Sequence, residues 1–86
     1  MNKLYCVINM FDFAQKVYLV NEEGNNVVAT STLEKLPEVI CTLCEDYKVN
    51  DVVIGTNKDL CEKLKDNTLR HAKTTYSNFN LNIEVM

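Results

Sequence analysis

The first third of the chain contains three stretches rich in β-branched and aromatic residues, separated by polar turns. Lys3–Asn9 and Gln15–Asn21 are predicted as the first two strands, and five residues between them are short enough for a hairpin connection. Glu22–Asn26 is rich in turn-forming residues, and Val27–Ser31 follows as a third strand. The pattern therefore predicts three antiparallel strands at the start of the domain.

After Ser31 the apolar residues recur at three- and four-residue spacing, which is typical of an amphipathic helix. Ser31 and Glu34 have the spacing of a capping box at its start. Pro37 is tolerated only near a helix start, so we expect the regular helix to begin at about Leu36, after a looser turn. The apolar face consists of Leu33, Leu36, Ile40, Leu43 and Tyr47.

The second half of the chain begins with a short apolar run, Asp51–Gly55, which is typical of a strand buried on both faces. Thr56 and Asn57 are predicted to cap a second helix that begins near Lys58. The inner face of this helix is formed by Leu60, Cys61, Leu64, Thr68 and Ala72.

The end of the chain consists of a polar segment and an alternating one. Thr74–Asn80 is predicted as a surface loop that is partly anchored by Phe79, and a contact loop formed by Tyr76 and Phe79 is the alternative. Leu81–Met86 alternates apolar and polar residues, so we expect a last strand with one face in water. The prediction is a single α/β domain, residues 1–86, with the order βββαβαβ, and right-handed crossovers would place both helices on one face of the sheet.

The opposite face of this sheet has no predicted helix to cover it, although its side chains are apolar. We therefore expect a second copy of the chain, or another protein, to cover it. The alternative is that these side chains are simply half exposed, as many apolar side chains are. The candidate interface residues are Tyr5, Val7, Phe11, Phe13 and Tyr18.

Four segments follow one another in a recognisable order: VIN at residues 7–9, KVYLVNEEGN at 16–25, the helix that follows, and DVVIG at 51–55. These local sequences and the order of elements resemble the Holliday-junction-resolvase branch of the ribonuclease H-like fold. This resemblance implies a five-stranded mixed sheet in the order 3-2-1-4-5. In catalytic members of the family, several carboxylates converge on divalent metal ions that act in nucleic-acid cleavage.

The chain departs from the family where the chemistry would lie. Asn9, a neutral amide, stands where the resemblance places the first catalytic Asp, and residues 54–57 supply no acid for the second. Asp12 is nearby, but one carboxylate does not make a two-metal site. We therefore expect a non-catalytic interaction or assembly module without a cofactor, and a metal-dependent nuclease that uses Asp12 is the alternative.

Ligands of open α/β sheets favour the carboxyl ends of adjacent parallel strands. There the sequence brings Asn9 and Asp12 near Gly55, Thr56 and Asn57, and a helix start offers free N–H groups to an anion. An anion- or nucleotide-binding module is therefore a further alternative. In the purely structural interpretation, Asp12 is a turn residue and Asn57 only caps the helix.

Net charge and cysteine usage limit the kinds of partner and the cellular compartment that we expect. The net charge of −3 argues against nucleic-acid binding, and no apolar run approaches the length of a membrane helix. With no signal segment visible, the four cysteines are interpreted as reduced core residues, including the CxxC pair Cys41 and Cys44, which lies inside a helix. We expect a cytoplasmic protein. The eleven Asn residues hint at a low-GC bacterium or one of its phages.

Overall fold

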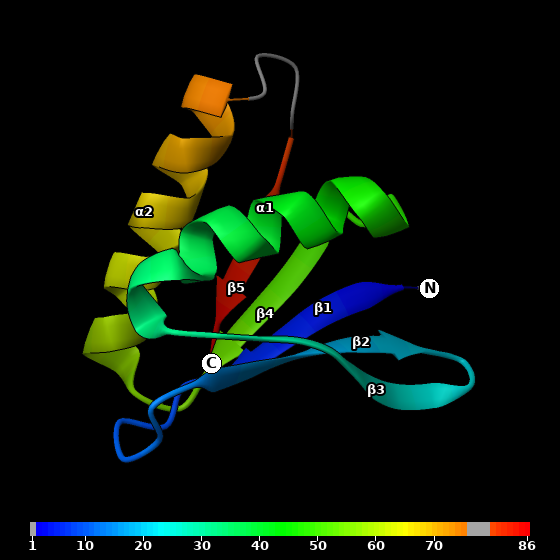
Figure 1. Cartoon of the computed structure of the whole chain (residues 1–86). Coiled ribbons are helices and arrows are strands. Elements are labelled where there is room, and N and C mark those ends of the chain that lie inside the picture. Colours follow the sequence, from blue (N-terminus) through cyan, green and yellow to red (C-terminus); the bar gives the residue numbers. More distant parts are fainter. Residues whose placement is uncertain (1, 76–79) are drawn as a thin grey trace.

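The computed structural model describes residues 2–75 and 80–86, and its elements follow the predicted order (Figure 1). The strands are β1 (Lys3–Val7), β2 (Gln15–Asn21), β3 (Gly24–Ser31), β4 (Asp51–Gly55) and β5 (Asn82–Val85). The helices are a 3-10 turn, η1 (Leu33–Lys35), followed by α1 (Leu36–Tyr47) and α2 (Lys58–Thr75).

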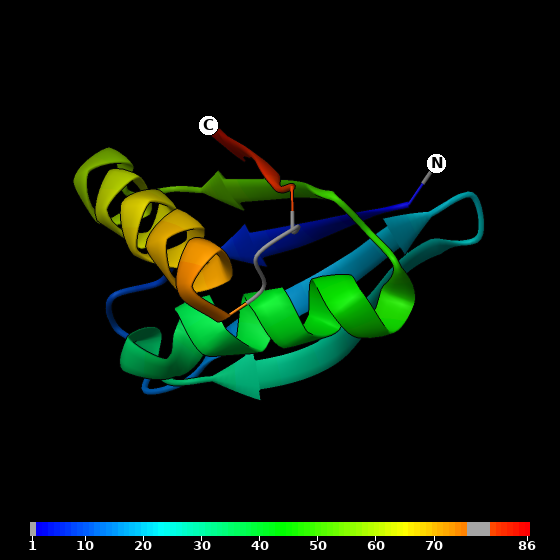
Figure 2. The ribbon, with the colours of Figure 1, turned by 90° about the horizontal axis from the view of Figure 1, so that it is seen from above.

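The five strands form one mixed sheet in the order β3-β2-β1-β4-β5. β2 pairs antiparallel with both β1 and β3, whereas β4 pairs parallel with both β1 and β5. Figures 1 and 2 show α1 and α2 together on one face of this sheet. The predicted α/β class, the strand order and the single helical layer are therefore confirmed.

The hydrophobic core lies between the sheet and the two helices. Leu4, Cys6 and Ile8 alternate along the first strand and are buried against the helices, whereas Tyr5 and Val7 lie on the opposite face. The largest fully buried side chains outside β1 include Val17, Leu36, Ile40, Val52 and Ile54. Burial on one side thus fixes which side chains remain on the helix-free face.

The turn between β2 and β3 is tighter than predicted. The two strands are already paired at Asn21 and Gly24, so only Glu22 and Glu23 form the turn. Gly24, the first residue of β3, has a φ of 127°, a conformation that glycine adopts easily because it carries no Cβ. The predicted turn through Asn26 was wrong at its end, and β3 begins three residues earlier than Val27.

The start of the first helix differs from the prediction in one detail. Regular α1 begins at Leu36 with Pro37 in its first turn, as predicted, and η1 is the looser turn before it. The capping box was wrong: Thr32 is the N-cap of η1 without a side-chain bond, and the Ser31 hydroxyl donates to the Thr32 carbonyl at 2.9 Å. A 3-10 turn here moves Glu34 away from the position that such a box requires.

The second helix follows the sequence prediction at its start and extends further at its end. The Asn57 carboxamide oxygen accepts a hydrogen bond from the Leu60 N–H at 3.1 Å, so Asn57 is the N-cap. The buried residues of α2 are Cys61, Leu64, Thr68 and Ala72. The helix continues to Thr75, so the predicted loop was wrong at its first two residues. Tyr76 and Phe79, the candidate anchor and contact residues of this loop, lie outside the described residues.

Candidate functional site: the carboxyl end and the helix-free face of the sheet

The connection between β1 and β2 is a loop at the carboxyl end of the parallel strands, and Asn9 closes it. The Asn9 carboxamide oxygen accepts from the Phe11 N–H at 3.0 Å, and its nitrogen donates to the Asp12 carboxylate at 3.1 Å. The Asp12 N–H also donates to the Asn9 carbonyl at 3.1 Å. β1 therefore ends at Val7, two residues before the predicted end, because Asn9 turns the chain.

A buried glutamine side chain holds the base of this loop. Gln15 is only 4% exposed, and its carboxamide oxygen accepts from the Asn9 N–H at 2.7 Å. Its nitrogen donates to the carbonyls of Asn9 at 2.9 Å and Asp12 at 3.1 Å. Sequence reasoning did not single out Gln15. The available signal was a polar residue at an inward position of β2, two residues before the buried Val17.

The chain after β4 attaches the loop to the rest of the sheet. The Thr56 hydroxyl donates to the Ile8 carbonyl, and the Ile8 N–H donates to the Gly55 carbonyl at 2.8 Å. The Asn57 side-chain nitrogen lies 3.3 Å from the Met10 sulfur. The structure thus brings the predicted ligand-binding residues to one end of the sheet, but the side chains of Asn9, Thr56 and Asn57 make contacts that hold the loop.

The chemistry of this end does not fit a two-metal nuclease centre. A hollow of about 390 Å³ is lined by Val7, Ile8, Asn9, Met10, Phe11, Thr56 and Asn57, none of which carries a charge. The carboxylate of Asp12 already accepts a bond from Asn9. Within residues 2–75 and 80–86, no three His, Cys, Asp or Glu side chains lie close enough together to hold a metal ion.

The helix-free face carries a row of side chains that crosses all five strands. Tyr5 lies beside Tyr18 on β2 and beside Val53 on β4, and the row ends at Val27 on β3 and Glu84 on β5. Tyr5 and Tyr18 are half-buried by their neighbours, and Val27 is 51% exposed. The centre of the face is therefore apolar over four strands.

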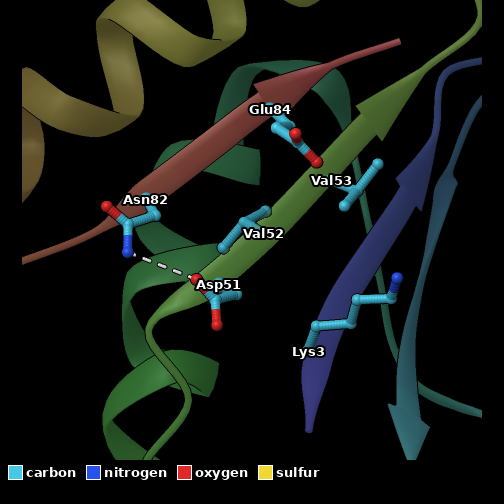
Figure 3. Close-up of a pocket in the computed structure, with 6 residues that line it drawn as sticks. All are labelled: Lys3, Asp51, Val52, Val53, Asn82 and Glu84. Carbon is cyan, nitrogen blue, oxygen red and sulfur yellow. Dashed lines mark hydrogen bonds between the residues drawn. The ribbon is translucent and has the colours of Figure 1, made fainter. Parts of the chain in front are cut away.

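Charged side chains surround this apolar row. A shallow hollow of about 450 Å³ lies on this side, and Figure 3 shows the residues that line it: Lys3, Asp51, Val52, Val53, Asn82 and Glu84. The Asn82 side-chain nitrogen donates to the Asp51 carboxylate at 3.3 Å. Acidic groups thus lie on β4 and β5, whereas Lys3 and Lys16 lie on β1 and β2.

Gly55 allows the Tyr5 side chain to lie along the sheet. A Cβ at Gly55 would be 3.3 Å from the Tyr5 hydroxyl oxygen and 3.8 Å from the Met86 Cβ. Since the first of these contacts is tighter than ordinary van der Waals contact, a side chain here would push the tyrosine away from the strand. The glycine therefore keeps this part of the face flat.

Exposed apolar side chains are concentrated at the carboxyl end of the parallel strands. In the described part of the chain, seven large hydrophobic residues are exposed, and five of them lie at this end: Met10, Phe11, Phe13, Leu33 and Met86. Phe11 is 97% exposed and Phe13 is 88% exposed. Met10, Phe11 and Phe13 belong to the loop that side-chain hydrogen bonds hold, and Leu33 and Met86 lie at the same end of the sheet. A cluster of exposed apolar side chains is typical of a contact surface.

The four cysteines belong to the core. All are free and buried, and the Cys41 thiol donates to the Thr68 carbonyl at 3.7 Å. Burial raises the pKa of Cys41 to about 11 and, together with a charge effect from Cys41, the pKa of Cys44 to about 12. A thiol of this kind stays protonated near neutral pH, which is the opposite of what a redox CxxC pair requires.

No protein-family model matches the sequence, and no curated protein matches it. The helices of the described residues include none with both the length and the apolar character needed to cross a membrane.

Proposed function

We propose that this protein is a non-catalytic ribonuclease H-like module that works by protein association, and that two copies of the chain meet through the helix-free face. The observation that carries the proposal is the apolar row centred on Tyr5 and Tyr18, which no described helix covers. The order of the elements and of the strands supports the ribonuclease H-like assignment.

The composition of this face matches that of a protein interface. The fully buried centre of an interface is enriched in aromatic residues and depleted of charge, and its rim is polar. Here Tyr5, Tyr18 and Val53 form the centre, and Lys3 and Glu84 lie at the edges. A face built for water would instead carry polar residues at these outward positions of the strands.

Two further observations favour association over catalysis. Asn9 and Asp12 bond to each other and to the loop backbone, and the residues around them supply no set of converging carboxylates. The four free, buried thiols are suited to a reducing compartment, which supports a cytoplasmic location.

The test compares two tyrosine substitutions by sedimentation equilibrium. We expect the unmodified protein to have the mass of a dimer at micromolar concentration, and Tyr18→Glu to have that of a monomer. Burying an unpaired carboxylate in the interface costs several kcal/mol, on the order of a hundredfold or more in the dissociation constant. The matched control is Tyr47→Glu, because Tyr47 is 42% exposed on α1, in the helical layer.

Circular dichroism tests whether both variants are folded. If Tyr18→Glu proves unfolded, Val27→Glu replaces it, since Val27 is more exposed and lies on the edge strand β3. A monomeric unmodified protein at high concentration, or equal dimerisation of the Tyr18 and Tyr47 variants, would show that this face is not the interface.

A further inference from the structure

A stable specific interface buries about 800 Å² of accessible surface on each partner. On the helix-free face, the apolar row consists of Tyr5, Tyr18, Val27 and Val53, and charged side chains lie around it. Exposed apolar side chains that adjoin this face would therefore enlarge a dimer contact.

The loop between β1 and β2 is the region that adjoins the face. Figure 1 shows it beyond the carboxyl ends of the strands and on the side of the sheet away from α1. Val7 of the face and Met10 and Phe11 of the loop line the same hollow, so the two surfaces are continuous. Phe11 is almost fully exposed, and an aromatic side chain buries about 150 Å² or more when covered. Phe13 lines a different hollow, of about 590 Å³, together with Leu33 of η1 and Leu60 of α2.

The loop is held in one conformation before any partner binds. The Gln15 side chain makes three hydrogen bonds to the backbone of Asn9 and Asp12, and Asn9 fixes the Phe11 N–H. Because the backbone is already ordered, little conformational entropy is lost when the two phenyl rings are buried. A loop of this kind is suited to act as an anchor in an interface.

Charge selects between two arrangements of the paired faces. In the first arrangement, the two-fold axis lies between the two sheets and runs perpendicular to the strands. Each strand then faces its own copy, and Glu84 faces Glu84 of the partner subunit. With the axis along the strands, between β1 and β4, Lys3 faces Asp51 of the partner subunit and Tyr18 faces Glu84 of the partner subunit. The strand registers place these residues at matching levels of the sheet. The second arrangement brings the Lys3 ammonium opposite a carboxylate, whereas the first, with its axis at the level of Tyr5, brings two Glu84 carboxylates together.

We infer that, in the dimer, the β1–β2 loop of each copy reaches over the carboxyl end of the partner's β4 and β5 and packs Phe11 against Met86 of the partner subunit. With the axis along the strands, a loop that emerges between β1 and β2 lies opposite the space between β4 and β5. Met86 is 71% exposed there, next to Gly55, and a thioether packs well against an aromatic ring. This inference rests on the proposed dimer.

The first experiment measures dimer affinity and monomer stability separately. We expect Phe11→Ala combined with Phe13→Ala to raise the dimer dissociation constant at least tenfold, and Tyr47→Ala, the matched aromatic control on α1, to leave it unchanged. The urea midpoint of the monomer, measured at a concentration where dimers are absent, should not change. An unchanged dissociation constant, or a lower monomer midpoint, would overturn the role of the loop.

The second experiment locates the contact by disulfide trapping. A Phe11→Cys protein is mixed with a Met86→Cys protein under mild oxidation, and covalent dimers are separated on a non-reducing gel. We expect the mixed Phe11→Cys and Met86→Cys dimer to form fastest, and a Phe11→Cys and Tyr47→Cys mixture to give none. Predominant pairing of Phe11→Cys with itself, or equal trapping with Tyr47→Cys, would overturn the inferred arrangement.

The two proposals fail in different ways. A monomeric unmodified protein removes the dimer and the loop contact together. If the dimer depends on Tyr18 but loop substitutions do not affect it, or if other cysteine pairs are trapped, only the loop contact is contradicted. The helix-free face then remains the proposed interface.

Discussion

Replacement of Gln15 by Met tests whether this one side chain holds the β1–β2 loop. Methionine has nearly the same length and shape but makes none of the three hydrogen bonds to Asn9 and Asp12. Each bond contributes about 1 kcal/mol net, and the Asn9 N–H loses its partner in a partly buried position. We expect the free energy of unfolding to fall by about 2–3 kcal/mol.

This loss is large for a domain of 86 residues, whose total stability is on the order of 4–13 kcal/mol. Urea unfolding followed by circular dichroism measures it, with the slope of the transition checked to be unchanged. The control is Glu62→Met, because Glu62 is exposed on α2, in the helical layer and away from both the loop and the helix-free face. A loss below about 0.5 kcal/mol for Gln15→Met, which is typical of a surface substitution, would refute the reasoning.

Two further predictions concern the thiols and the helix cap. Burial, with a smaller charge effect from Cys61, raises the pKa of Cys6 from its ordinary value of 9.0 to about 12. The folded protein therefore keeps a proton that the unfolded chain releases above pH 9, and its stability should fall by about 1.4 kcal/mol per pH unit for each such thiol. Urea unfolding at pH 8, 9 and 10 under reducing conditions measures this, and a flat profile would contradict it. Asn57→Ala should cost about 1 kcal/mol through the lost cap of α2, measured in the same way, whereas Asn57→Asp should retain most of the stability.

The elements of the fold were predictable because each carries its own local signal. The run Asp51–Gly55 is a strand with the predicted bounds, and Pro37 marks the start of regular α1. The alternation along the last strand correctly places Asn82 and Glu84 in water and Ile83 in the core. In these segments, local propensity and burial favour the same structure.

The arrangement of the candidate site was less predictable because it depends on contacts between separate segments. The sequence placed Asn9, Asp12 and Asn57 at one end of the sheet, and the structure brings them there. It did not indicate that Gln15 would fold back on Asn9, since a single polar residue in a strand has no periodic signal. The Ser31–Glu34 box failed because a 3-10 turn replaced the expected first turn of an α-helix.

The central position of β1 has a consequence for the order in which the chain folds. β1 pairs with β2 across a short loop, but its other neighbour, β4, begins more than forty residues later in the sequence. During synthesis on the ribosome, the β1–β2–β3 meander is complete well before β4 emerges. Until then, the backbone N–H and C=O groups along one edge of β1 have no strand to pair with. We expect β4 docking, a nonlocal parallel pairing, to be the slow step of folding.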